Sequence, residues 1–139
     1  MILVLFHKAP DGRLTWKITD FGFSSAARIP FPKPRSLGRM TTNYFAPELL
    51  ISWRYDTKVD IWSAGCILYE LATGQQAFRA ADEVREYAWS GKDFVNIASV
   101  RPGLGREIEC IVGMMLNVLP EMRPNAKKVL REISALTRL

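Results

Sequence analysis

The sequence feature that most constrains this chain is an apolar run from Thr57 to Gly74, TKVDIWSAGCILYELATG. Its apolar side chains fall on every side of a helix with about 3.6 residues per turn, and such a helix has to be enclosed by protein. Thr57 followed by Asp60 is a capping-box pattern, and Gly74 is a typical helix end. We therefore expect a central buried helix over residues 57–73, around which the other elements pack.

A membrane span is the alternative for such a stretch. Lys58, Asp60 and Glu70 interrupt it, and the apolar run is shorter than the roughly 20 residues that cross a bilayer.

The whole chain has 139 residues, of which 48% are hydrophobic, and this suits one globular domain with its own core. The formal charge of +5 allows anionic partners such as phosphates, but no basic run is interleaved with aromatic residues. We expect neither a membrane nor a nucleic-acid partner.

The two cysteines of the chain form neither a disulfide framework nor a metal-ligand spacing. Cys66 lies in the apolar run, and Cys110 lies in a second apolar pattern. We expect both to be reduced core residues of an intracellular, cytoplasmic protein. The apolar start, MILVLF, is broken by His7 and Lys8, so it favours a strand over a signal peptide.

The N-terminal part of the chain combines strand patterns with a long loop. Residues 2–6 and 14–19 are rich in β-formers, and Pro10-Asp11-Gly12 between them is a turn signal, so we expect a β-hairpin. The stretch from 20 to 39 has three prolines, four basic side chains and no clear periodicity. It predicts a long loop, and long loops in compact domains are usually functional.

Three further segments show apolar residues spaced by three and four, which is typical of amphipathic helices. They are residues 80–90, 107–116 and 125–136. In the first of them we expect Val84, Tyr87 and Ala88 to face inward. The fold predicted from these patterns is mainly α: a short β-hairpin, a long loop, and a helical bundle around one buried helix.

Four short motifs resemble those of eukaryotic-type protein kinases and stand in the same order and spacing. They are Asp20-Phe21-Gly22, Ala46-Pro47-Glu48, Asp60-Ile61-Trp62-Ser63-Ala64-Gly65 and Pro120-Glu121-Met122-Arg123-Pro124. Each is a modest signal alone, but together they are strong. The chain is similar to the C-terminal lobe of a serine/threonine kinase domain, an α+β arrangement, beginning within the catalytic loop. The resemblance implies an activation segment over residues 20–48.

The resemblance also implies ATP and Mg²⁺ as cofactors. In phosphoryl transfer a carboxylate must hold the magnesium ion that bridges the nucleotide phosphates, and Asp20 matches that position. Phe21 would pack beneath it, and Gly22 would give the backbone freedom to turn. A plain turn after a strand explains the tripeptide alone, but the downstream motifs favour the kinase.

One strand residue and two helix residues match the apolar column of the nucleotide site in this family. Leu3 is the best match for the residue that touches the adenine base. Ile67 and Leu71, four residues apart in the apolar run, match the side chains below it. Ordinary core packing explains all three equally well.

The substrate class follows from Thr41, which matches the threonine of the family element G-T-x-x-Y-x-A-P-E. A protein substrate modified on serine or threonine is therefore expected. Met40 departs from the family pattern, where glycine is usual, so the loop before Thr41 can take a different path. Ser36 lies where such kinases often carry an activating phosphate, with basic residues nearby that could receive it. A merely solvated serine is the alternative.

Other matched residues have structural roles in the family. The resemblance pairs Glu48 with Arg123 as a buried ion pair that ties the activation segment to the last helices, a role that suits the fork of donors of an arginine. Asp60 matches the carboxylate that receives N–H groups of the catalytic loop, although an acid in the first turn of a helix needs no such role. The segment 80–90 resembles the family's docking helix for substrates and regulatory proteins.

The catalytic base of the family and its upper lobe would lie before residue 1, and Met1 falls where the metal-binding asparagine belongs. We therefore expect residues 1–139 to be an incomplete lower lobe that transfers no phosphate alone. The rival hypothesis is a catalytically dead scaffold or protein-binding module. A helix that covers one face of the central helix in the family also lies upstream, so we expect the isolated chain to be aggregation-prone or molten.

Overall fold

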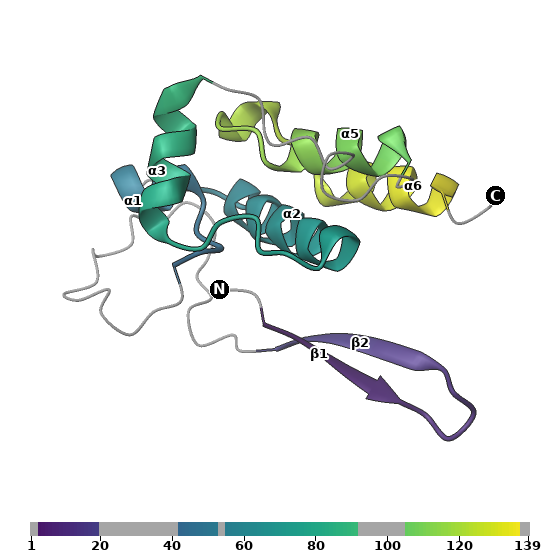
Figure 1. The fold of residues 1–139 in the computed structure, drawn as a ribbon. Coiled ribbons are helices and arrows are strands. Elements are labelled where there is room, and N and C mark those ends of the chain that lie inside the picture. Colours follow the sequence, from purple (N-terminus) through teal and green to yellow (C-terminus); the bar gives the residue numbers. More distant parts are fainter. Residues whose placement is uncertain (1–2, 20–41, 53–54, 92–104, 137–139) are drawn as a thin grey trace.

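The computed structural model describes residues 3–19, 42–52, 55–91 and 105–136. The elements in chain order are β1 (Leu3–Lys8), β2 (Leu14–Thr19), α1 (Pro47–Ile51), α2 (Lys58–Thr73), α3 (Ala81–Ser90), α5 (Arg106–Met115), the 3-10 helix η2 (Pro120–Met122) and α6 (Ala126–Leu136). Figure 1 shows the helices gathered into one body, with the β-hairpin beside it. The structure is mainly helical with a small antiparallel sheet, as the sequence predicts.

Helix α2 packs along one face against α5 and η2. Trp62, Cys66 and Tyr69 point into this core and are at most 5% exposed. The two helices approach closely at Gly65, where an added Cβ would lie 2.9 Å from the Cβ of Met115. A residue without a Cβ at position 65 therefore allows this close approach of α2 and α5.

The opposite face of α2 is open in the described structure. Leu71 is 63% exposed, and Ile67 is only partly buried. Among the described residues, α2 is therefore enclosed only in part, and from the sequence we also expect one face of this helix to lack its cover. Its described neighbours cover the face that carries Trp62 and Cys66, and apolar periodicity does not say which sides have neighbours.

Helix α2 also begins differently from the prediction. Thr57 has helical backbone angles and makes no side-chain cap, so the predicted capping box is wrong. Asp56 takes that place: its Oδ1 accepts a hydrogen bond from the Lys58 N–H at 2.8 Å. Gly74 ends the helix as expected, with φ at 72° and its N–H donating to the Glu70 carbonyl at 2.8 Å.

Helix α3 is attached to the body by an aromatic cluster. Trp62 stacks on Phe78 with 5.5 Å between ring centroids, and Tyr87 of α3 lies 6.1 Å from Trp62. The Tyr87 hydroxyl donates to the Leu116 carbonyl at 3.0 Å, and Val84 is fully buried. Helix α3 therefore presents Val84 and Tyr87 inward and leaves its other face to solvent. It lies beside α1 (Figure 1).

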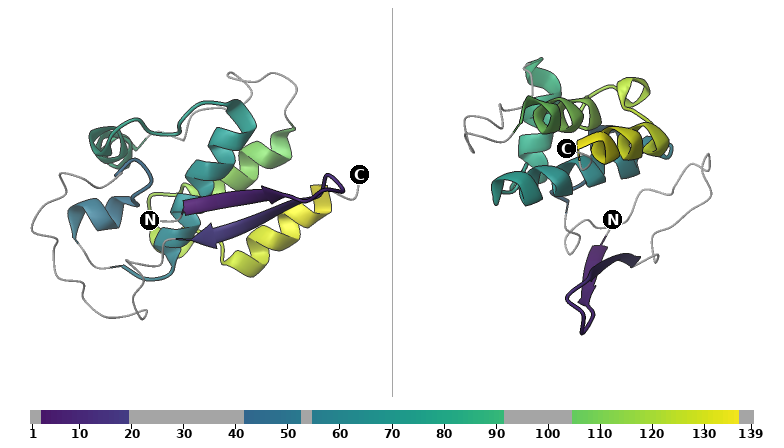
Figure 2. Two further views of the ribbon diagram at one scale, coloured as in Figure 1. Left: turned by 90° about the horizontal axis from the view of Figure 1, so that it is seen from below. Right: turned by 90° about the vertical axis from the view of Figure 1, so that its right-hand side faces the viewer.

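The hairpin has one apolar face that the described residues leave uncovered. Strands β1 and β2 pair in antiparallel register with Phe6 opposite Trp16, and residues directly opposite each other share a face. The large apolar side chains on this face are all more than half exposed: Phe6, Leu14, Trp16 and Ile18. The right-hand view of Figure 2 shows the hairpin standing away from the helices.

The two cysteines differ in their surroundings. Cys66 is buried, and this burial raises the pKa of its thiol to about 12. Cys110 is exposed on α5, so the expectation that both cysteines are core residues is wrong for Cys110. Helix α5 turns Ile111, Val112 and Met115 to the core instead, which puts Cys110 on its outer side.

Within the described ranges, no helix has both the length and the apolar character that a membrane crossing needs.

Candidate functional site

Most residues predicted to bind nucleotide, metal or substrate lie outside the described ranges. These are Asp20, Phe21, Gly22 and Thr41, and the predicted phosphorylation site Ser36 lies outside the described ranges as well. Leu3 is the first residue of β1 and pairs with Thr19. In the part of the chain that the structure describes, no three His, Cys, Asp or Glu side chains gather as metal ligands. The predicted site residues whose side-chain contacts the structure describes are therefore Glu48, Asp60 and Arg123.

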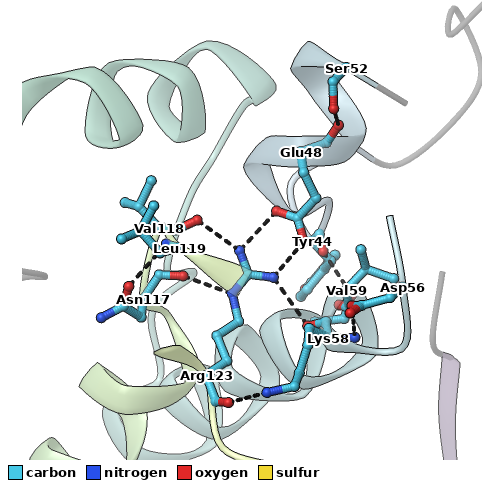
Figure 3. A network of polar contacts seen from close by, with 11 residues as sticks. Tyr44, Glu48, Ser52, Asp56, Lys58, Val59, Asn117, Val118, Leu119 and Arg123 are labelled. Atoms are coloured by element: carbon cyan, nitrogen blue, oxygen red, sulfur yellow. Dashed lines mark hydrogen bonds and ion pairs between the residues drawn. The ribbon is translucent and has the colours of Figure 1, made fainter. Parts of the chain in front are cut away.

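Glu48 and Arg123, 75 residues apart, meet in a two-point contact (Figure 3). The Nη1 atom of Arg123 donates to Oε1 of Glu48 at 2.6 Å, and Nη2 donates to Oε2 at 2.8 Å. The Arg123 side chain is 0% exposed and that of Glu48 is 12% exposed. Two parallel charge-assisted hydrogen bonds in a desolvated place fix both the distance and the orientation of α1 relative to the chain around η2.

The other donors of the Arg123 guanidinium contact backbone carbonyls. Nε donates to Asn117 at 2.7 Å, Nη1 to Lys58 at 3.1 Å and Nη2 to Val118 at 3.2 Å. The Lys58 ammonium in turn donates to the carbonyl of Arg123. A buried guanidinium is tolerated only when its charge and its N–H groups are satisfied, and here one carboxylate and three carbonyls do so (Figure 3).

The guanidinium group of Arg123 lies over the ring of Trp62. The Cζ atom of Arg123 lies 5.0 Å from the centroid of the Trp62 ring, which is a cation–π distance. The ring is 0% exposed, and its Nε1 is the one buried side-chain donor or acceptor without a partner among the described residues. Burial of this indole therefore depends on stacking with Arg123 and Phe78 rather than on a hydrogen bond of its own.

A second polar link joins the chain before α1 to α2. The Tyr44 hydroxyl donates to Oε2 of Glu70 at 2.8 Å, and the Ser63 hydroxyl donates to the Tyr44 carbonyl at 2.8 Å. Burial, together with the hydrogen bond to Glu70, raises the pKa of Tyr44 to about 12. The sequence reasoning missed this pair. Its signals are the tyrosine of the motif matched at Thr41, which falls on residue 44, and the acid at position 70 inside an apolar helix.

Asp60 lies in the first turn of α2 and is partly exposed. Partial burial raises the pKa of its carboxyl group above the ordinary value. Within the described ranges no donor contacts this carboxylate, so its predicted contact with backbone N–H groups stays a prediction.

Comparison with known proteins gives the family. The sequence model of the protein kinase domain matches residues 4–133. Two similar proteins are the mitogen-activated protein kinase HOG1 of Scheffersomyces stipitis, 43% identical over 74 residues, and that of Candida albicans, 42% identical over 74 residues. Each match covers 52% of this chain but only 18% of the relative, far less than two thirds of its length. Because the family match extends over nearly the whole sequence, the chain belongs to the protein kinase family.

Proposed function

We propose that residues 1–139 are part of the lower lobe of a serine/threonine kinase, which transfers the γ-phosphate of ATP to serine or threonine side chains of protein substrates. The observation that supports this most is the buried Glu48–Arg123 contact, 2.6 Å at its shorter bond, because it joins two of the kinase motifs. In the proposed kinase, this buried ion pair would hold the end of the activation segment, residues 20–48, against the helical body.

The nucleotide part of the proposal concerns residues around the first kinase motif. Magnesium, when bound, neutralises charge on the nucleotide phosphates. We infer that Asp20 supplies the carboxylate that holds it, with Phe21 packed beneath and Gly22 allowing the turn. Leu3 of β1 would contact the adenine base. The hairpin supports this, because its register places Leu3 opposite Thr19, the residue that precedes Asp20.

The substrate part concerns the activation segment over residues 20–48. Thr41 would lie beside the hydroxyl group of the protein substrate that receives the phosphate. The hydrogen bond of Tyr44 to Glu70, 2.8 Å long, supports this because it fixes the chain three residues after Thr41. Ser36 is proposed as a site of activating phosphorylation, since Arg28, Lys33 and other basic residues near it in sequence could pair with a phosphate.

Two further assignments complete the proposal. Asp60 would accept hydrogen bonds from backbone N–H groups of the catalytic loop, and its raised pKa agrees with a carboxylate that lacks these donors among the described residues. Helix α3 would dock a regulatory protein, because its outer face carries an exposed tryptophan, Trp89. We place such a kinase in the cytoplasm.

The test is Asp20→Asn in the full-length kinase. We expect phosphate transfer from labelled ATP to a protein substrate to fall to background, because an amide replaces the magnesium-binding carboxylate, while the melting temperature stays unchanged. Asp11→Asn, in the exposed hairpin turn, is the matched control and should keep the wild-type rate. Wild-type transfer by Asp20→Asn would contradict the metal assignment, and a wild-type protein without transfer would favour a scaffold.

A further inference from the structure

Helix α3 carries a hollow on the face that is turned away from the core. The hollow has a volume of about 400 Å³ and is lined by Asp82, Arg85, Glu86, Trp89 and Ser90. Residues 82, 85, 86 and 89 are three and four apart, so their side chains are neighbours along one helix face. Trp89 is 76% exposed, more than any other large apolar side chain in the described ranges. An indole left in water at such a place is available to a partner.

The charges on this helix are not all balanced. The Arg85 guanidinium donates to Oδ1 of Asp82, so these two charges offset each other. Oε2 of Glu83 accepts the backbone N–H of Arg79 at 2.7 Å. Glu86 has no ion pair with any described residue, and it lies one turn before Trp89. The hollow therefore combines an open indole face with a negative charge that has no cation beside it in the described part of the chain.

We propose that this hollow binds the guanidinium group of an arginine carried by a protein partner. An indole face attracts a cation placed over it, and a neighbouring carboxylate accepts two N–H donors from a planar guanidinium. Lysine can supply the charge but neither the plane nor the fork of donors. The inference rests on the proposed docking role of α3, and it specifies which chemical group the partner presents there. Glu86, which has no ion pair among the described residues, would repel an acidic group at this place.

The test uses two matched peptides, acetyl-Gly-Arg-Gly-amide and acetyl-Gly-citrulline-Gly-amide, which differ in charge but hardly in shape. They are titrated into the full-length kinase labelled with ¹⁵N-tryptophan, and the indole N–H signal of Trp89 is followed after assignment with Trp89→Phe. We expect the arginine peptide to shift this signal and the citrulline peptide to bind about threefold to thirtyfold more weakly. Glu86→Gln should weaken binding of the arginine peptide by about twofold to fivefold.

Glu121→Gln is the matched control, because it removes the same charge from an exposed position on η2. It should leave the affinity for the arginine peptide unchanged. Equal binding of citrulline, no effect of Glu86→Gln, or tighter binding of acetyl-Gly-Glu-Gly-amide would each overturn the proposal. The peptide titration needs no catalysis, so its failure is distinct from a failure of the phosphate-transfer test with Asp20→Asn.

Discussion

Two arginine–carboxylate pairs in this molecule have the same length and opposite surroundings. In the hairpin turn, Arg13 lies 2.6 Å from Asp11 with side chains 83% and 50% exposed, whereas in the helical body Arg123 lies 2.6 Å from Glu48 with side chains 0% and 12% exposed. An exposed pair contributes little, because water solvates both charges nearly as well. In a buried pair, each charge depends on the other. Distance alone therefore does not say which contact holds the fold together.

Two tryptophans repeat this contrast. Trp62 is 0% exposed and lies between Phe78 and the Arg123 guanidinium, whereas Trp16 is 54% exposed and contacts Phe6 at 5.6 Å between ring centroids. The helical body is thus defined by buried, specific contacts. The hairpin depends on its backbone ladder and one aromatic pair, and an isolated two-stranded hairpin is only marginally stable in water.

The strongest test of the contrast breaks the buried pair. Glu48→Ala or Arg123→Ala should lower the free energy of unfolding by about 3 to 5 kcal/mol, because each leaves one buried charge without its partner. The double variant should lose much less than the sum of the two single losses. Chemical denaturation of the four proteins gives this cycle, and additive losses would show that the two residues are not energetic partners.

The exposed pair provides the matched control. Arg13→Ala removes an arginine from a contact of the same 2.6 Å length and should change the free energy of unfolding by about 0.5 kcal/mol or less. A loss comparable to that of Arg123→Ala would remove the basis of the comparison.

A second test uses two helical glycines. A Cβ at Gly65 would meet Met115 at 2.9 Å and Leu116 at 3.0 Å, so Gly65→Ala should destabilise by about 1 to 3 kcal/mol through overpacking. A Cβ at Gly113 on α5 would meet nothing within 4 Å, so Gly113→Ala should stabilise by roughly 0.5 to 1 kcal/mol through helix propensity. Thermal melts of both variants would show opposite shifts, and shifts of the same sign would refute the close approach at residue 65.

The third test concerns the uncovered hairpin face. Trp16→Thr keeps a good strand former but removes a side chain that is 54% exposed. In the 139-residue chain it should change the free energy of unfolding of the helical body by about 0.5 kcal/mol or less. It should also reduce self-association, measured by sedimentation velocity, because it interrupts an exposed apolar face. A large loss of body stability would mean that the hairpin packs on the helices after all.

The parts of this fold that the sequence predicted are those with local signals. Apolar spacing predicted residues 80–90 as a helix, and the structure has Ala81–Ser90. The turn at Pro10-Asp11-Gly12 predicted the hairpin, and Gly12 indeed has φ at 85°. The proximity of Glu48 and Arg123 has no local signal, because 75 residues separate them, and only the resemblance of two motifs suggested it.

The remaining features depend on neighbours that a local pattern does not contain. The all-round apolar pattern of α2 alone does not predict that Leu71 is 63% exposed, since burial needs another element on that side, and only the resemblance suggested an uncovered face. Cys110 fits an apolar spacing but lies on the outer side of α5. Asp and Thr are both good cap residues, so the local pattern does not distinguish Asp56 from Thr57, and it is Asp56 that accepts the N–H of Lys58.

The smallest effect is expected at the hairpin turn and depends on pH. The Oδ1 atom of Asp11 accepts the backbone N–H of Arg13 at 3.0 Å, and this bond, together with the Arg13 side chain, lowers the pKa of Asp11 below its ordinary value. A carboxyl group with a lowered pKa in the folded state stabilises that state above its unfolded pKa, and the contribution is lost as the pH falls through the folded value. Amide chemical shifts of β1 and β2 should therefore move toward unfolded values only below about pH 4, and Asp11→Asn should remove this dependence. Unchanged pH dependence in Asp11→Asn would show that another group controls the turn.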